Sequence, residues 1–172
     1  YSSAASDVYK RQPKLSMDIQ NVLNSDIAMI LDQLIDTNKE KSEQLSAINT
    51  TNAWAREARE IHKNDKQSLF GIVQGGIHKE LREISAIHMI ELNFDGYAIG
   101  GLAVGESQKE MFETVKNITD KMPENKPRYL MGVGTPSDIL GAVKRGVDMF
   151  DCVLPTRSGR TGLAFTWQGR VN

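Results

Sequence analysis

Residues 94–106 read FDGYAIGGLAVGE, and this stretch decides the fold class. The apolar run 97–99 is followed at once by Gly100 and Gly101, which is typical of a buried parallel strand that ends in a loop. Runs of the same kind occur on both sides of it, at 27–31 (IAMIL), 69–73 (LFGIV), 129–133 (YLMGV) and 149–153 (MFDCV). The sequence therefore predicts five strands that are buried on both faces.

Stretches with helical spacing separate these runs, and strands that alternate with helices predict βαβ units around a parallel sheet. A fourth helix is expected between Pro136 and Gly146, because proline favours helix starts and glycine favours helix ends. An open doubly wound sheet and an incomplete (β/α)8 TIM barrel of about five βα units both fit, since a whole barrel takes about 250 residues. The residues expected on the other buried helix faces are Leu45, Ile48, Ala55, Ala58 and Ile61, with an interruption at 49–52; Leu81, Ile84 and Ile87, to which Met89 and Ile90 could be added; and Met111 or Phe112, Val115 and Ile118.

The composition is that of a folded, non-membrane domain. The chain has 172 residues, 40% of them hydrophobic, and a formal net charge of −1. No apolar run approaches the roughly 20 residues of a membrane helix, so we expect no membrane partner. Residues 1–12 are small, polar and aperiodic, and we expect an unassigned leader there that is non-native or disordered, followed by one partial barrel domain at 13–172. One cysteine, Cys152, excludes an internal disulfide framework and a cysteine-based zinc site, and it is compatible with a cytoplasmic location.

Polar or glycine-rich segments follow each predicted strand. Asp32 follows the first run, Gln74 the second and the loop 100–105 the third, while Asp151 interrupts the fifth. In parallel α/β folds the carboxyl ends of the strands form the ligand crevice, so these groups are expected to converge. Asp32 alone could instead be a turn or cap residue, and Gln74 could belong to an ordinary loop. Asp151 is harder to explain structurally, because a carboxylate in an apolar strand needs a partner or a function.

Other chemistry-bearing residues give weaker signals. His62, His78 and His88 lack metal-ligand spacing and are interpreted as surface or helix-packing residues, and Cys152 as a core residue. Arg157 and Arg160 flank a Ser-Gly turn that we expect to be flexible, where they could clamp phosphates or simply be solvated. Residues 143–172 hold five basic and two acidic side chains, a local net charge of +3 that suits a polyanion.

Four segments carry a family resemblance: SLFGIVQGG, FDGYAIGGLAVGE, YLMGVGTP and MFDCVLPTRSGRTG, in this order over 15–172. They resemble the bacterial tRNA-guanine transglycosylases of the queuine tRNA-ribosyltransferase family. The resemblance implies a TIM-barrel pentosyltransferase that exchanges guanine at position 34 of tRNAs with a GUN-type anticodon for the queuosine precursor preQ1. It also implies a covalent aspartyl–ribose intermediate, a cytoplasmic location and a homodimer at full length.

The same resemblance implies roles for individual residues. Asp151 matches the nucleophile, Arg157 and Arg160 match contacts to the tRNA backbone, and Val104 matches the bacterial pattern LAVG. The residues that match the base pocket are Asp32, Gln74, Gly101, Leu102, Ala103, Glu106 and Met131.

Departures from the family pattern bear on base selection and on completeness. Leu34 stands where the family has a cysteine that touches the base, and the loop 33–40 is not proline-rich. The family's second catalytic aspartate lies N-terminal to this segment, and its structural zinc is held by residues beyond Asn172, so we expect no metal ligands in this chain, no organic cofactor and no turnover by the chain alone. Three alternatives are a non-catalytic homologous tRNA-binding subunit, an archaeal-type enzyme and an unrelated phosphate-binding enzyme that uses GGLAVG.

Overall fold

The computed structural model describes residues 13–36 and 39–171, so the expected leader at 1–12 lies outside the described residues. In chain order its elements are α2 (Pro13–Leu23), β1 (Ile27–Met29), α3 (Lys41–Ile61), β2 (Ser68–Val73), α4 (Lys79–Glu91), β3 (Gly96–Ile99), α5 (Gln108–Thr119), β4 (Arg128–Leu130), α6 (Pro136–Val143), β5 (Met149–Phe150), α7 (Leu154–Arg160), β6 (Ala164–Thr166) and β7 (Gly169–Val171). None of the described helices is long and apolar enough to cross a membrane.

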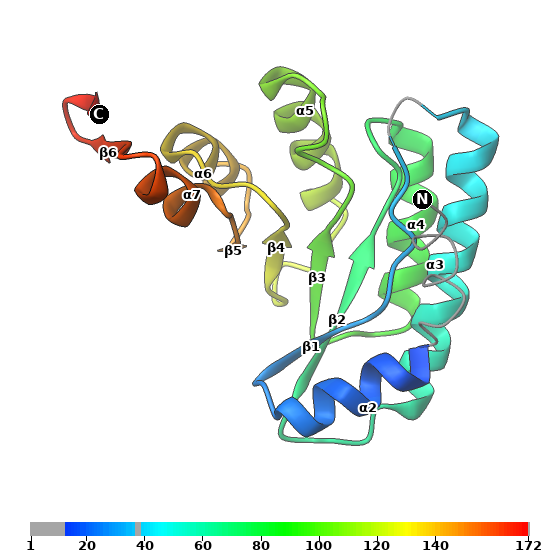
Figure 1. Cartoon of the computed structure of the whole chain (residues 1–172). Coiled ribbons are helices and arrows are strands. Elements are labelled where there is room, and N and C mark those ends of the chain that lie inside the picture. The colour runs from blue at the N-terminus through cyan, green and yellow to red at the C-terminus, as the bar shows by residue number, and fades with distance from the viewer. Residues whose placement is uncertain (1–12, 37–38, 172) are drawn as a thin grey trace, which may run out of the picture.

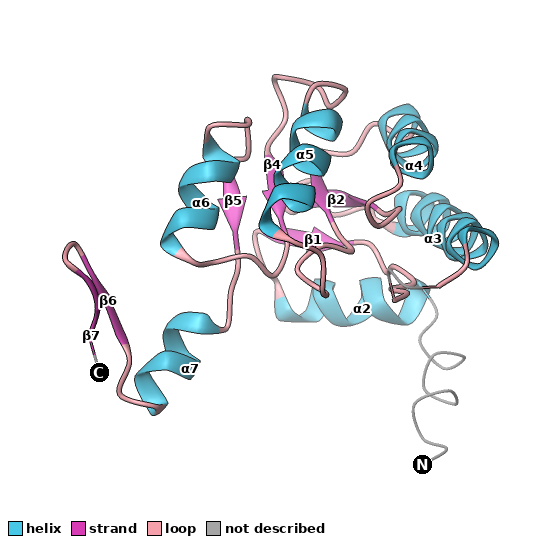
Figure 2. Cartoon of the chain, turned by 90° about the horizontal axis from the view of Figure 1, so that it is seen from above, coloured by secondary structure: helices cyan, strands magenta, loops and turns pink. Residues whose placement is uncertain are grey.

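The strand order decides between the two parallel architectures. β1 to β5 form one parallel sheet in the order β1-β2-β3-β4-β5, without the reversal that defines a doubly wound sheet. Because crossover connections are right-handed, strands that advance in one direction leave their helices on one side. Figure 2 shows α3, α4, α5 and α6 in an arc along the strands. The sheet is therefore a curled half-barrel, an incomplete TIM barrel as predicted.

The central strands form the core because their residues are apolar on both faces. Every residue of β3 and all but the first of β2 are buried. Phe70 pairs with Gly96 and Val73 with Ile99, which fixes the register of the two strands. This is the arrangement that parallel sheets require when helices cover them.

Two of the predicted helices differ in detail from the structure. α3 continues through 49–52, where the Thr51 hydroxyl donates to the carbonyl of Ala47 (2.9 Å) and accepts from the backbone N–H of Gln33 (3.0 Å). The helix is therefore not interrupted at 49–52, and the polar residue Thr51 there makes a buried contact to the loop after β1. On α4, Ile84 and Ile87 are exposed, and Arg82 and Ser85 are buried in their place.

The carboxyl-terminal segment differs from the sequence-based expectation. Leu154–Arg160 form α7 instead of a flexible turn, with Pro155 in the first turn, where proline favours a helix. β6 and β7 form an antiparallel hairpin after it. Figures 1 and 2 show α7 and this hairpin projecting away from the sheet.

Candidate active site

The candidate residues gather at one edge of the sheet, because all five strands are parallel. Gln74 directly follows β2, Gly100 directly follows β3, Met131 directly follows β4 and Asp151 directly follows β5, while Asp32 lies shortly after β1. Met131 and Asp151 were expected inside their strands. Both strands instead end before them, so these residues lie just beyond the carboxyl ends of the strands, the edge at which parallel α/β folds bind ligands.

Asp32 and Gln74 form a hydrogen-bonded pair. The Gln74 Nε2 donates to Asp32 Oδ2 at 2.5 Å, and the Gln74 backbone N–H donates to Ser85 Oγ at 3.0 Å. Gln74 is buried and Asp32 is half-buried. Burial raises the pKa of the Asp32 carboxyl above its ordinary value, and the hydrogen bond from Gln74 offsets part of that rise. A carboxylate and an amide oxygen held side by side can accept several N–H donors from one planar ligand.

The glycines that follow β3 let the Gln74 side chain lie against the backbone. A Cβ on Gly100 would come within 2.6 Å of Gln74 Nε2, and a Cβ on Gly101 within 2.5 Å of Gln74 Oε1. Gly101 also has φ +63°, in the left-handed region that other residues enter at a cost. A side chain at either position would therefore displace the Gln74 amide.

Glu106 fixes the peptide between Leu102 and Ala103. Its carboxylate accepts hydrogen bonds from the backbone N–H of Ala103 and from that of Val104, the latter at 3.1 Å. Ala103 has φ +59°, an uncommon conformation for a residue with a Cβ. Because a trans peptide is planar, the Leu102 carbonyl points away from Glu106 and presents an acceptor on the opposite side.

Asp151 is exposed, which corrects the expectation that it is buried in an apolar strand. Its Oδ1 accepts from the Tyr129 hydroxyl at 2.7 Å and from the Gly132 backbone N–H at 2.8 Å. Within residues 13–36 and 39–171, Oδ2 accepts no hydrogen bond and faces no salt-bridge partner. Burial, and then the hydrogen bond and charge of Asp151, raise the pKa of Tyr129. The carboxylate is therefore oriented through one oxygen, and its other oxygen is available.

Tyr129 was missed in the sequence because it reads as one more apolar residue of the run 129–133. The only sequence signal for Tyr129 is that it precedes Met131 by two residues. In an extended chain, residues two apart point to the same face, so Tyr129 is expected on the same face as Met131.

The remaining candidates are less constrained. Met131 is half-buried and packs against the buried apolar residues of the hydrophobic core. Leu34 is 61% exposed, so its side chain contributes little to packing. Arg157 and Arg160 are exposed on α7, and neither makes a salt bridge within the described part of the chain. The structure thus brings the pocket residues to one edge and leaves the two arginines on the projecting segment.

No metal-binding cluster stands out at this edge. The described ranges contain no group of three or more His, Cys, Asp or Glu side chains that could hold a metal ion. Cys152 is half-buried, and its Sγ accepts from the backbone N–H of Leu154 at 3.3 Å. His62 is buried and lies 3.3 Å from Gln67 Oε1 through its Nε2.

Comparison with known proteins identifies the family. The family model described as Queuine tRNA-ribosyltransferase matches residues 2–172, a range that includes most of the expected leader. Similar proteins named Queuine tRNA-ribosyltransferase come from Rickettsia bellii (53% identical over 167 residues, 96% of this chain) and Rickettsia typhi (51% over 165 residues, 95% of this chain). The chain spans 46% of the length of each of these relatives. A match over this much of the chain shows that it belongs to the queuine tRNA-ribosyltransferase family.

Proposed function

We propose that this chain carries the base pocket and the nucleophile of a tRNA-guanine transglycosylase, which exchanges guanine 34 of tRNA for preQ1. The observation that carries the proposal is the Asp151 carboxylate, at the same sheet edge as the Asp32–Gln74 pair: it is held through Oδ1, and no described residue bonds to its Oδ2. A non-catalytic tRNA-binding subunit would have no use for a carboxylate oriented in this way.

The pocket suits a guanine-like base. Guanine and preQ1 share an edge with an imino and an amino N–H, and the Asp32 carboxylate can accept both. The Gln74 amide beside it contributes an acceptor or a donor to the same plane. The preQ1 base also carries an aminomethyl group, which is positively charged at neutral pH. The Leu102 carbonyl, turned away from Glu106, is an acceptor for that ammonium.

The reaction is two displacements at the ribose C1′ of nucleotide 34. In the first, Asp151 Oδ2 attacks C1′, the C1′–N9 bond breaks, and guanine leaves with the bonding electron pair and takes up a proton. In the second, N9 of preQ1 gives its proton to solvent, which balances the proton that guanine took up, and attacks C1′. The C1′–Oδ2 bond then breaks and releases the Asp151 carboxylate. This is the logic of a retaining glycosidase, in which a carboxylate holds the sugar between the two steps. The donors on Oδ1 hold the carboxylate so that the other oxygen can reach C1′.

The tRNA backbone is proposed to contact Arg157 and Arg160. Both guanidinium groups are exposed on α7, beside the strand end that carries Asp151. Phosphate contacts of this kind position a nucleic acid without reading its sequence. The described residues contain no ligand set suitable for the zinc that the family resemblance implies.

The test replaces the nucleophile in a complete enzyme. Residues 13–172 are substituted for the matching segment of the Rickettsia bellii relative, and Asp151→Asn is compared with Asp148→Asn. Asp148 loses the same charge at the other end of β5, where its carboxylate accepts from the Arg128 backbone N–H at 2.8 Å. We expect Asp151→Asn to bind tRNA normally and to form no denaturant-resistant protein–tRNA band, while Asp148→Asn keeps exchange. If Asp151→Asn kept more than about a tenth of the exchange rate, a barrier change of under ~1.4 kcal/mol, Asp151 would not be the nucleophile.

A further inference from the structure

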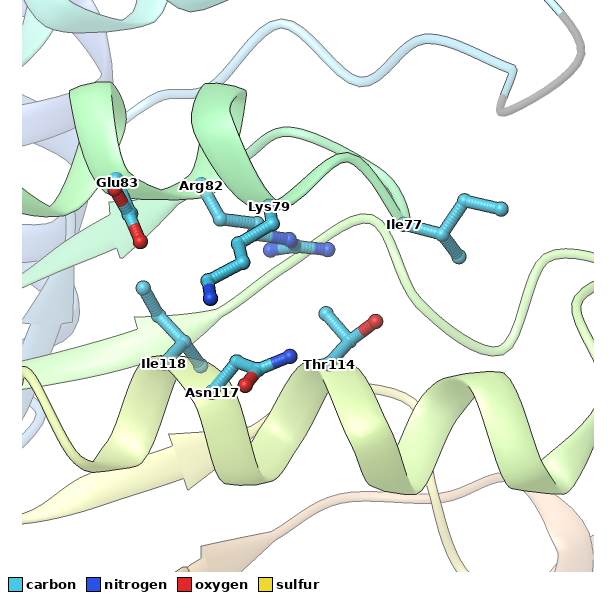
Figure 3. Close-up of a pocket in the computed structure, with 7 residues that line it drawn as sticks. All are labelled: Ile77, Lys79, Arg82, Glu83, Thr114, Asn117 and Ile118. Atoms are coloured by element: carbon cyan, nitrogen blue, oxygen red, sulfur yellow. The ribbon is translucent and has the colours of Figure 1, made fainter.

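Arg82 is the most deeply buried charged residue that the proposed reaction does not use. It is 2% exposed on α4 and lines a small pocket between α4 and α5 (Figure 3). Its guanidinium donates three hydrogen bonds, all to backbone carbonyls. Nη1 bonds to Val73 (2.8 Å), Nε to Gly76 (2.7 Å) and Nη2 to Gly101 (3.3 Å).

These three carbonyls belong to the backbone segments that lie next to Gln74. Val73 is the last residue of β2, Gly76 lies in the turn before α4, and Gly101 lies in the loop after β3. Gln74 sits between the first two in sequence and packs against the third, since a Cβ on Gly101 would come within 2.5 Å of its Oε1. One rigid, planar side chain thus ties together the backbone segments on both sides of Gln74.

Stability alone does not account for a cation at this position. Burial lowers the pKa of Arg82 to about 9, and the charge of Glu106 opposes that change. No carboxylate pairs directly with Arg82 within residues 13–36 and 39–171. Buried charges are costly, and well-packed apolar residues often replace them without loss of stability. What an apolar residue cannot do is hold three separate carbonyls in a fixed geometry.

We propose that Arg82 is a positioning residue: it fixes the Gln74 turn and the loop after β3 in one relative geometry, through which Gln74 meets the base. The contact of Gln74 with the base rests on the proposed function, whereas the fixed geometry of the two loops does not depend on it. Arg82 touches neither base nor ribose in this assignment and acts only through Gln74 and Gly101.

The test compares Arg82→Lys with a matched variant at the opposite end of the sheet. Arg128 also clamps backbone carbonyls, donating from Nη2 to Met122 (2.8 Å) and from Nη1 to Gly146 (3.4 Å). Lysine keeps the charge at each position but loses the fork of donors. Arg128→Lys therefore controls for the loss of a carbonyl clamp away from the strand ends that carry the candidate site.

Two readouts separate the loops from the base, both on the 172-residue chain. The first is amide hydrogen exchange at Gln74 and Gly100, whose N–H groups bond to Ser85 Oγ and to the Val73 carbonyl (both 3.0 Å). We expect Arg82→Lys to speed exchange at these amides at least fivefold and to leave Tyr97 and Asp148 unchanged. Arg128→Lys should give the opposite pattern. The second is preQ1 affinity, which Arg82→Lys should lower about tenfold and Arg128→Lys less than twofold.

A double variant gives a third readout that a purely structural role would not move. Adding Arg82→Lys to Gln74→Ala should cost little further preQ1 affinity, because the positioned side chain is already gone. Unchanged exchange at Gln74 and Gly100 in Arg82→Lys would overturn the inference, as would fast exchange throughout the unmodified chain. If exchange responds as expected but the unmodified chain binds no preQ1, the positioning of the loops stands and the proposed function fails.

Discussion

Replacing Gly101 with alanine tests the packing on which the proposed base pocket depends. Gly101 has φ +63°, and a Cβ there would lie 2.5 Å from Gln74 Oε1. That distance is well inside van der Waals contact, so the Gln74 amide must move. Because the amide is also the donor to Asp32, its movement disturbs the hydrogen-bonded pair.

The magnitude has two separable parts. The left-handed backbone costs a residue with a Cβ about 1–2 kcal/mol, which lowers the melting temperature of a domain of this size by roughly 2–8 °C. If Gln74 binds the base as proposed, displacing it costs a further ~1–3 kcal/mol of binding, or about 5- to 150-fold in affinity. The first part reduces stability, and only the second reduces preQ1 affinity.

Gly162 supplies the control, because it has φ +77° and a Cβ added there would meet no atom of the described residues within 4 Å. Gly162→Ala carries the same kind of backbone strain without the contact to Gln74. Thermal melts followed by circular dichroism measure stability, and preQ1 titration by calorimetry measures affinity. If a folded Gly101→Ala chain bound preQ1 within twofold of the unmodified chain, the assignment of Gln74 to the base would be refuted.

Three further predictions concern Asp32, Tyr129 and the arginines of α7. Burial raises the pKa of Asp32, so ionisation of its carboxyl lowers the stability of the fold as the pH rises through the folded-state pKa. Asp32→Asn should therefore have a higher melting temperature than the unmodified chain at pH 7 but not at pH 3. Equal differences in melting temperature at both pH values would contradict this. In the complete enzyme that carries residues 13–172, Tyr129→Phe removes the hydroxyl that donates to Asp151 Oδ1 at 2.7 Å. It should slow formation of the tRNA adduct about tenfold, with tRNA affinity unchanged. Arg157→Ala and Arg160→Ala should each weaken tRNA binding for every substrate sequence. Each should also reduce, by about one, the slope of the logarithm of tRNA affinity against the logarithm of salt concentration. A change in base selectivity with an unchanged slope would count against phosphate contact.

The strands could be predicted because their signal is simple. All five predicted runs contain a strand, but burial on both faces is confirmed only for the central strands β2 and β3. The strands β1, β4 and β5 are partly buried. The ends of β4 and β5 could not be predicted, because the apolar run continues into the loop. Val133 is buried after β4 has ended, although it belongs to no strand.

The predicted buried faces of α3 and α5 are largely confirmed, since Ile48, Ala55, Ala58, Met111, Val115 and Ile118 are buried. The face of α4 was predicted less well, because apolar spacing ignores buried polar residues. On α4 the pattern selects Ile84 and Ile87, which are 46% and 58% exposed. Arg82 and Ser85 face the sheet instead, because each has hydrogen-bond partners there: the carbonyls at the strand ends and the backbone N–H of Gln74. Burial of these residues depends on partners that are distant in sequence, and no local pattern reveals them.

Asp151, the proposed nucleophile, shows how the environment of a residue can differ from what the sequence predicts. Its position in MFDCV indicates a buried carboxylate, yet β5 ends at Phe150 and the side chain is exposed. In a parallel sheet the first residue beyond a strand is still surrounded by apolar sequence, while its side chain has already reached the crevice. A carboxylate there needs no burial to be held, because Tyr129 and Gly132 on the neighbouring strand and loop donate to one oxygen. The proposed role of Asp151 as a nucleophile requires that its other oxygen be able to reach the ribose.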